Sequence, residues 1–374
     1  MKPQRLRTYP MQSIARISQA ACLASLLGAA GATAQQPARI ALGSCRDSCG
    51  LSLVLEAELG DDSGPGMIDL TGTVSAYRDA SKRTYIVGEP IDHILVFDPG
   101  GRFLRRIGRT GSGPGEFRRG SSLVVTGDGE FSVFDRGRGV ILNFDYTGRL
   151  RGEVRTVGEQ FPSGVETYRW EGPWVLHVTN MRTPERAGYP LHPVNVETGE
   201  IGRSFGSSTG ELELGGGWIP SIAITGDRRI WMARSPLDRY EISLWDRNQE
   251  LVLFRRDAPW FPERTDPLPH GRLEDKPLPA IDDLVATDSL LWVSGVVADE
   301  QWQNAGNYYD SDARYDGFVE AIDLRTNRVV GSQRFDFEFT NFIEPGLIGR
   351  VHITENASVR FRMYRVVLDA GRRR

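Results

Sequence analysis

The side chains of this sequence that could carry out chemistry are few and scattered. Its histidines stand singly, without an HExxH motif, at His93, His177, His192, His270 and His352. Zinc sites use three or four His, Cys or carboxylate ligands, so isolated histidines favour a structural role. We therefore expect no catalytic residue and no bound cofactor. His177 and His352 lie in strand-like runs, and they are the histidines that could face a channel and hold a divalent metal.

Two long, loop-like stretches carry the aromatic side chains that are best suited to ligand binding. One is a proline-rich stretch from Ala258 to Pro279, and the other runs from Asp299 to Asp312. Long loops on a rigid scaffold commonly carry function, and aromatic rings beside carboxylates suit carbohydrate or peptide ligands. The alternative is that these loops only cover the end of their structural unit. The predicted ligand-binding residues are Trp260, Phe261, Trp302, Tyr308 and Tyr309.

A group of arginines raises the question of an anion-binding patch. Its members are Arg102, Arg105, Arg106, Arg109, Arg118 and Arg119. In the expected strand from Phe103 to Ile107, Arg105 shares a face with the apolar residues and Arg106 points to the opposite face. Charged side chains on an outer strand also protect a sheet edge. We favour this structural interpretation over a binding patch.

The elements that must position these residues are indicated by an internal repeat of about fifty residues. In each copy an apolar run ends in an acidic residue, a turn follows, and a second strand begins. The acidic positions are Asp98, Asp145, Glu197, Asp246, Asp323 and Asp369. Their separations of 47, 52, 49, 77 and 46 residues match the period of a four-stranded propeller blade, with one blade carrying inserted loops. We expect Asp98, Asp145, Asp246 and Asp323 to accept backbone N–H hydrogen bonds in turns.

The repeat leaves one unit incomplete, and the beginning of the chain offers a strand to complete it. The last copy ends after its third strand, at Leu368, whereas Leu51–Ala57 alternates like a strand and belongs to no other copy. An open sheet edge is a liability. We therefore predict an all-β fold, a six-bladed propeller of four-stranded antiparallel blades, in which this early strand completes the last blade.

The first 34 residues are typical of an export signal. Four basic residues are followed by the apolar run Ala20–Ala30 and by the small-x-small site Ala32-Thr33-Ala34. We expect residues 1–34 to be removed, residues 35–374 to form the propeller, and no membrane-spanning segment to remain. Removal takes the formal net charge from −4 to −8, and such an acidic protein is not suited to nucleic acid.

Two cysteines follow this segment, in the sequence Cys45-Arg-Asp-Ser-Cys49. Two thiols with no histidine nearby leave a zinc site short of ligands. An exported chain folds in an oxidising compartment, where disulfides persist. We therefore predict a disulfide between Cys45 and Cys49, whose very short loop contributes little stability.

Two stretches of the sequence resemble a known group of proteins. Residues 95–103, Leu-Val-Phe-Asp-Pro-Gly-Gly-Arg-Phe, resemble the core phrase of NHL-repeat propellers. The glycine-rich run from Ile107 to Phe117 resembles the phrase that joins blades in exported bacterial six-bladed propellers. The resemblance covers residues 50–150 best. It implies six blades and a location outside the cytoplasm, but the fold alone does not decide function.

Two functional hypotheses remain open from the sequence. The first is a non-catalytic propeller, periplasmic or extracellular and monomeric, which binds a protein, peptide or carbohydrate. The second is a metal-dependent hydrolase or lyase whose site lies at the central channel. The second requires at least three metal-ligating side chains to converge on the axis.

Overall fold

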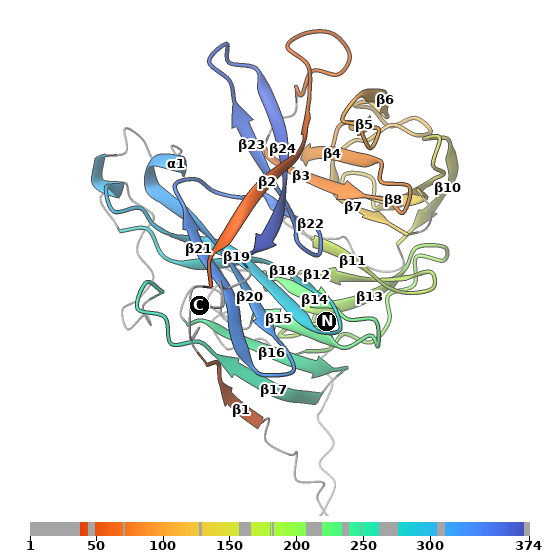
Figure 1. Cartoon of the computed structure of the whole chain (residues 1–374). Coiled ribbons are helices and arrows are strands. Elements are labelled where there is room, and N and C mark those ends of the chain that lie inside the picture. Colours follow the sequence, from red (N-terminus) through yellow and green to blue (C-terminus); the bar gives the residue numbers. More distant parts are fainter. Residues whose placement is uncertain are drawn as a thin grey trace, which may run out of the picture. The chain divides into compact units, whose positions relative to one another are not determined.

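The chain folds into a six-bladed β-propeller of antiparallel sheets, as a computed structural model shows (Figure 1). The structure describes residues 38–43, 49–69, 72–126, 129–156, 166–179, 181, 183–206, 219–233, 239–247, 249–261, 276–304 and 311–369. Helix in this part of the chain is limited to one turn, α1 (Ser311–Arg314), and a 3-10 segment, η2 (Trp302–Asn304). The predicted fold class is therefore confirmed.

The first three blades form around the first three copies of the repeat. Blade 1 contains β3 (Thr73–Arg78), β4 (Thr84–Glu89), β5 (Ile94–Phe97) and β6 (Phe103–Ile107). Blade 2 contains β7 (Gly120–Val125), β8 (Phe131–Asp135), β9 (Val140–Phe144) and β10 (Leu150–Arg155). Blade 3 contains β11 (Glu166–Glu171), β12 (Trp174–Val178) and β13 (Leu191–Asn195). In place of its fourth strand, Ile201 and Phe205 make single bridges to β13.

The last three blades follow the same order of strands. Blade 4 contains β14 (Ile222–Ile224), β15 (Ile230–Ala233), β16 (Glu241–Asp246) and β17 (Gln249–Arg255). Blade 5 contains β18 (Ala280–Ala286), β19 (Leu290–Ala298), β20 (Tyr315–Asp323) and β21 (Arg328–Phe335). Blade 6 contains β22 (Asn341–Glu344), β23 (Leu347–Ile353), β24 (Val359–Leu368) and β2 (Leu51–Leu59).

Blade 6 is completed by a strand from the other end of the sequence, as predicted. β2 pairs antiparallel with β24, with Leu51 opposite Leu368 and Leu53 opposite Val366, and Figure 1 shows the two strands side by side. Carboxylates of β2 face guanidinium groups of β24 across this pairing. Glu58 accepts a hydrogen bond from Arg362 at 2.5 Å. The register of the apolar residues and the paired charges therefore both favour β2 as the partner of β24.

A second strand near the beginning of the chain was not predicted. β1 (Ala38–Ala41) pairs in parallel with β17, which makes blade 4 five-stranded. Gly43 then exchanges backbone hydrogen bonds with β21 and its preceding turn, because its N–H donates to Asn327 and its carbonyl accepts from Val329. β1, Gly43 and β2 therefore lie against the outer strands of blades 4, 5 and 6 in turn.

Each interface between neighbouring blades contains its own apolar cluster. Phe97 of blade 1 and Phe361 of blade 6, both fully buried, belong to one of these clusters. Trp231 of blade 4 and Phe318 of blade 5 belong to another. Because the apolar faces of a blade are covered only by the blades on either side, the sheets stabilise one another around the ring.

The recurrent aspartates have the structural role that their spacing predicts. One carboxylate oxygen of Asp98 accepts the N–H groups of Gly100 and Arg102, both at 2.9 Å. Asp145 and Asp323 accept backbone N–H groups in their own turns in the same way. The turn at Asp246 includes residue 248, which lies outside the described residues, so its role stays a prediction.

Candidate functional site

The first strands of the blades surround the centre of the propeller. β3 contacts β7, β7 contacts β11, β14 contacts β18, β18 contacts β22, and β22 returns to β3. We call these six the inner strands, and we call the end at which they begin the strand-start end. Within each antiparallel blade the connection from the second to the third strand also lies there, as does the connection to the next blade. Trp260, Phe261 and Trp302 therefore lie in connections at the strand-start end.

Polar side chains join the inner strands of neighbouring blades. The Asn341 side chain of β22 accepts the N–H of Ala76 in β3 at 3.1 Å and donates to the carbonyl of the same residue at 2.8 Å. Ser122 of β7 and Thr167 of β11 share a buried hydrogen bond of 2.8 Å. These contacts satisfy polar groups that would otherwise be left unpaired where two sheet edges meet.

The carboxylate of Asp283 joins the inner strands of blades 5 and 6. Asp283 of β18 accepts the N–H of Phe342 in β22 at 2.6 Å and the N–H of Leu284 at 2.8 Å. A register shift between Ile281 and Asp283 marks a bulge in the strand at this point. Bulges often redirect a side chain beside a functional site. This bulge in β18 contains two consecutive aspartates, Asp282 and Asp283.

Acidic side chains from blades 3 and 5 gather at the strand-start end. Burial raises the pKa of Asp283 well above its usual range, and the charge of Glu166 raises it further. Asp282 is exposed to solvent. Desolvation by the surrounding protein and the charges of Glu338 and Glu166 nevertheless raise its pKa to about 8. Desolvation by the surrounding protein also raises the pKa of Glu166, although this residue is exposed. The charge of Glu166 thus disfavours the ionised forms of Asp282 and Asp283.

Two tyrosines lie beside these carboxyl groups. Tyr168 of β11 donates a short hydrogen bond to Glu166, two residues earlier in the same strand. Burial raises the pKa of Tyr77 in β3, and Glu166, Asp283 and Glu89 raise it further through their charges. Both phenols therefore stay neutral donors at physiological pH.

Blade 2 presents two arginines at the same end of the propeller. The buried carboxylate of Asp135 accepts the N–H groups of Arg118 at 2.7 Å, Arg119 at 3.1 Å and Gly137 at 2.9 Å. It thereby fixes the residues before β7 to the turn after β8. Burial and the nearby charge of Arg119 lower the pKa of Arg136, while Glu89 opposes that change.

Together these residues can bind charge. Glu166, Asp282 and Asp283 can accept hydrogen bonds from a cationic group, and Tyr77 and Tyr168 add aromatic faces and phenolic donors. A cation placed beside these carboxylates offsets the repulsion that raises their pKa values. The charge of Glu89 in blade 1 raises the pKa of both Glu166 and Arg136. The strand-start end therefore carries opposite charges on neighbouring blades.

His177 and His192 make hydrogen bonds inside the fold. His177 is fully buried between blades 2 and 3, and its Nδ1 lies 2.9 Å from the hydroxyl of Thr167. His192 bonds to Ser204 and to the carbonyl of Thr179. His270 lies outside the described residues. Among the residues that are described, no group of three or more His, Cys, Asp or Glu side chains is arranged to hold a metal ion.

The structure separates the predicted ligand-binding aromatic residues. Phe261 is 4% exposed, and it packs with Trp260 against Tyr240 and Phe318 in the cluster between blades 4 and 5. Trp302 is half-buried on the other loop, under the guanidinium of Arg314. Tyr308 and Tyr309 lie outside the described residues. Trp260 and Phe261 thus hold their loop to the core, and ligand binding by all five predicted residues stays a prediction.

Most of the clustered arginines pair locally, as the structural interpretation expects. Arg105 donates to the carbonyl of Thr147 at 2.8 Å, and Arg106 pairs with Asp69. Arg102 and Arg109 pair with Asp98 and Glu116 within their own turns. Arg118 and Arg119 are exposed instead, and Arg136, which the sequence pattern did not single out, lies next to Arg119.

The acidic side of this site was missed in the sequence. Glu166 opens β11, and Asp282 and Asp283 follow the start of β18. One signal was present, since two consecutive aspartates near the beginning of an apolar inner strand contradict its packing pattern. No property of the sequence alone indicates that blades 3 and 5 bring these carboxyl groups together.

Proteins of similar sequence or structure have the same kind of fold. Residues 69–162 match the family model DUF5128, described as a 6-bladed beta-propeller. A member of the DUF4221 family from Bacteroides vulgatus has a similar structure, with 11% identity, a TM-score of 0.61, and coverage of 85% of this chain and 99% of the other. A candidate exported protein from Bacteroides fragilis has 13% identity and a TM-score of 0.56, with coverage of 88% and 99%. No curated protein matches the sequence.

These similarities and the ring of inner strands define the class of the protein, a six-bladed β-propeller. At such low sequence identity, they show the fold alone. In the described residues, no helix has the length and apolar character needed to cross a membrane. The function must therefore be argued from the strand-start end itself.

Proposed function

We propose that this chain is an exported, non-catalytic binding propeller that recognises a ligand carrying positive charge at the strand-start end of its axis. The observation that carries the proposal is that Glu166 of blade 3 and Asp283 of blade 5 both lie near the start of their inner strands, β11 and β18. Each of these two strands contributes a carboxyl group, and the charge of Glu166 raises the pKa of Asp283. An arrangement that costs the free protein stability favours a ligand that neutralises it.

The surrounding groups narrow the chemistry of this ligand. Carboxylates bind ammonium or guanidinium groups through charge-assisted hydrogen bonds. The phenols of Tyr77 and Tyr168 suit a partly apolar ligand with hydrogen-bonding groups, since tyrosine combines both properties. A peptide with a free amino group or a basic side chain fits this combination. Within the described residues, no observation favours the metal-dependent alternative.

Export is part of the proposal. Residues 1–34 have the composition of an export signal, and a structural relative is described as a candidate exported protein. We place the protein in the periplasm or outside the cell, as a monomer. The disulfide between Cys45 and Cys49 belongs to the same proposal, because Cys45 lies outside the described residues. Mass spectrometry of the non-reduced protein purified from its native compartment tests both the cleavage and the disulfide.

Calorimetric titration with triglycine amide, which has an ammonium group and no carboxylate, tests the site. We expect binding to release protons, because a cation lowers the pKa of the raised carboxyl groups, so the measured heat should depend on the ionisation enthalpy of the buffer. Glu166→Gln and Asp282→Asn should each weaken binding by about tenfold. N-acetyl-triglycine amide should not bind.

The matched control is Glu171→Gln, which removes a partly exposed carboxylate, paired with Arg228, at the other end of the same strand, β11. It should bind triglycine amide like the unmodified protein. The acidic group is not the binding site if Glu166→Gln, Asp282→Asn and Glu171→Gln bind triglycine amide equally. The same conclusion follows if N-acetyl-triglycine amide binds as well as triglycine amide.

A further inference from the structure

Arg119 and Arg136 are held side by side by the backbone. Arg119 immediately precedes β7, and Arg136 immediately follows β8, where Gly120 and Asp135 are paired residues. Asp135 accepts N–H groups from both segments. A side chain at Gly137 would lie 3.0 Å from the Cβ of Arg119, so the glycine allows the two segments to approach closely. The position of this pair is therefore built into the start of blade 2.

The two guanidinium groups differ from those of neighbouring arginines, which pair with carboxylates. Arg138 and Arg109, which are near in sequence, pair with Glu153 at 2.6 Å and Glu116 at 2.7 Å. Within the part of the chain that the structure describes, no ion pair joins the side chain of Arg119 or Arg136 to a carboxylate. Arg136 is moreover half-buried. Two like charges held close together repel each other, and a bound anion would remove that repulsion.

We propose that Arg119 and Arg136 bind a carboxylate group of the ligand. The planar guanidinium fork matches a carboxylate in a two-point contact. Glu89 lies near Arg136, and its negative charge disfavours a dianion such as phosphate more than a singly charged carboxylate. If that function holds, the complete ligand is zwitterionic, and a short peptide with both termini free has the required chemistry.

Four related probes separate the two halves of the site. N-acetyl-triglycine carries only the carboxylate, triglycine amide only the ammonium, triglycine both, and N-acetyl-triglycine amide neither. We expect N-acetyl-triglycine to bind the unmodified protein, and Arg119→Gln or Arg136→Gln to weaken it by about tenfold or more. Inorganic phosphate should bind less tightly than N-acetyl-triglycine.

Arg325→Gln is the matched control. Arg325 is an exposed arginine in the turn between β20 and β21, away from the strand-start end, with its side chain 83% exposed. Its substitution should leave the binding of N-acetyl-triglycine unchanged. The assignment is overturned if the two test variants bind N-acetyl-triglycine as the unmodified protein does, if its amide binds equally well, or if phosphate binds more tightly.

The arginine pair and the acidic group of the proposed function are tested by different probes. Triglycine amide reports on Glu166 and Asp282, whereas N-acetyl-triglycine reports on the arginine pair, so either half can fail while the other holds. Thermal unfolding gives a second readout. Removing one of two repelling charges should leave the melting temperature of Arg119→Gln unchanged or raise it. A clear fall in melting temperature would instead show a structural arginine and overturn the proposal.

Discussion

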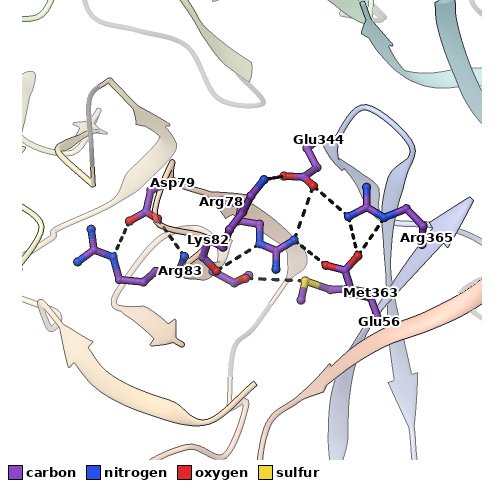
Figure 2. Close-up of polar contacts among 9 residues, drawn as sticks. Glu56, Arg78, Asp79, Lys82, Arg83, Glu344, Met363 and Arg365 are labelled. Carbon is purple, nitrogen blue, oxygen red and sulfur yellow. Dashed lines mark hydrogen bonds and ion pairs between the residues drawn. The ribbon is translucent and has the colours of Figure 1, made fainter. Parts of the chain in front are cut away.

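Arg365 of β24 donates two hydrogen bonds to one carboxylate oxygen of Glu56 in β2, at 2.6 and 3.0 Å, across 309 residues of sequence. The other oxygen of Glu56 accepts from Arg78 of blade 1 at 2.8 Å. Glu344 of β22 accepts from Arg365 and from Lys82, and Figure 2 shows the connected network. The strand that closes blade 6 is thus tied by charge to its own blade and to blade 1.

This network predicts a pH-dependent contribution to stability. Partial burial raises the pKa of Glu56, but hydrogen bonds from Arg78 and Arg365 outweigh it and lower the pKa below 4.5. A lowered folded-state pKa stabilises the protein above the unfolded value, and this stabilisation disappears as the pH falls through the folded value. Glu56→Gln should therefore cost about 1 kcal/mol or less at pH 7, and the difference should shrink by pH 3. Thermal unfolding across that range measures it, and a constant difference would contradict the assignment.

The closing strand β2 also offers two leucines with opposite surroundings. Leu59 is fully buried between blades 6 and 1, whereas Leu55 is 52% exposed. Leu59→Ala should lower the free energy of unfolding by about 2 to 4 kcal/mol, because it leaves a cavity in a packed cluster. Leu55→Ala, its control in the same strand, should change stability by about 0.5 kcal/mol or less. Equal losses in denaturant unfolding would show that β2 packs differently.

Asn341 joins the inner strands of blades 6 and 1. Asn341→Ala removes both hydrogen bonds to Ala76 and leaves a backbone N–H and a carbonyl without their side-chain partner. We expect a loss of about 1 to 3 kcal/mol in the free energy of unfolding. Asn341→Asp keeps an acceptor for the N–H but removes the donor. Its free energy of unfolding should therefore lie between those of the unmodified protein and Asn341→Ala. A loss-free Asn341→Ala variant would show that water replaces this contact without cost.

The acidic group at the strand-start end predicts the opposite pH dependence. The pKa of Asp282 is near 3.8 in the unfolded chain and about 8 in the folded protein. Between these values the folded protein binds the proton more tightly, so stability falls as the pH rises from about 4 to about 8. Asp282→Asn should resemble the unmodified protein at pH 4 and unfold at a higher temperature at pH 9. A variant that loses stability equally at both pH values would show a different role for this carboxyl group.

The repeat and the turn aspartates made most of the fold predictable. Local rules place Asp98 and Asp145 in their turns, and the alternation of Leu51–Ala57 marks a strand in need of a partner. β1 escaped prediction because only four residues pair there, too few for a clear pattern. The carboxyl groups of Glu166 and Asp283 escaped because the closing of the ring, and no local rule, brings their blades together.

The path of the chain from β1 through Gly43 to β2 has a consequence for the order of folding. Its partners, β17, β21 and β24, become available one after another along the sequence, and Ser52 must wait for Asp369, 317 residues later. Contacts of such long range form slowly. The propeller should therefore persist for a time as an unclosed arc, and the unpaired edge of β24 is then the surface most exposed to aggregation.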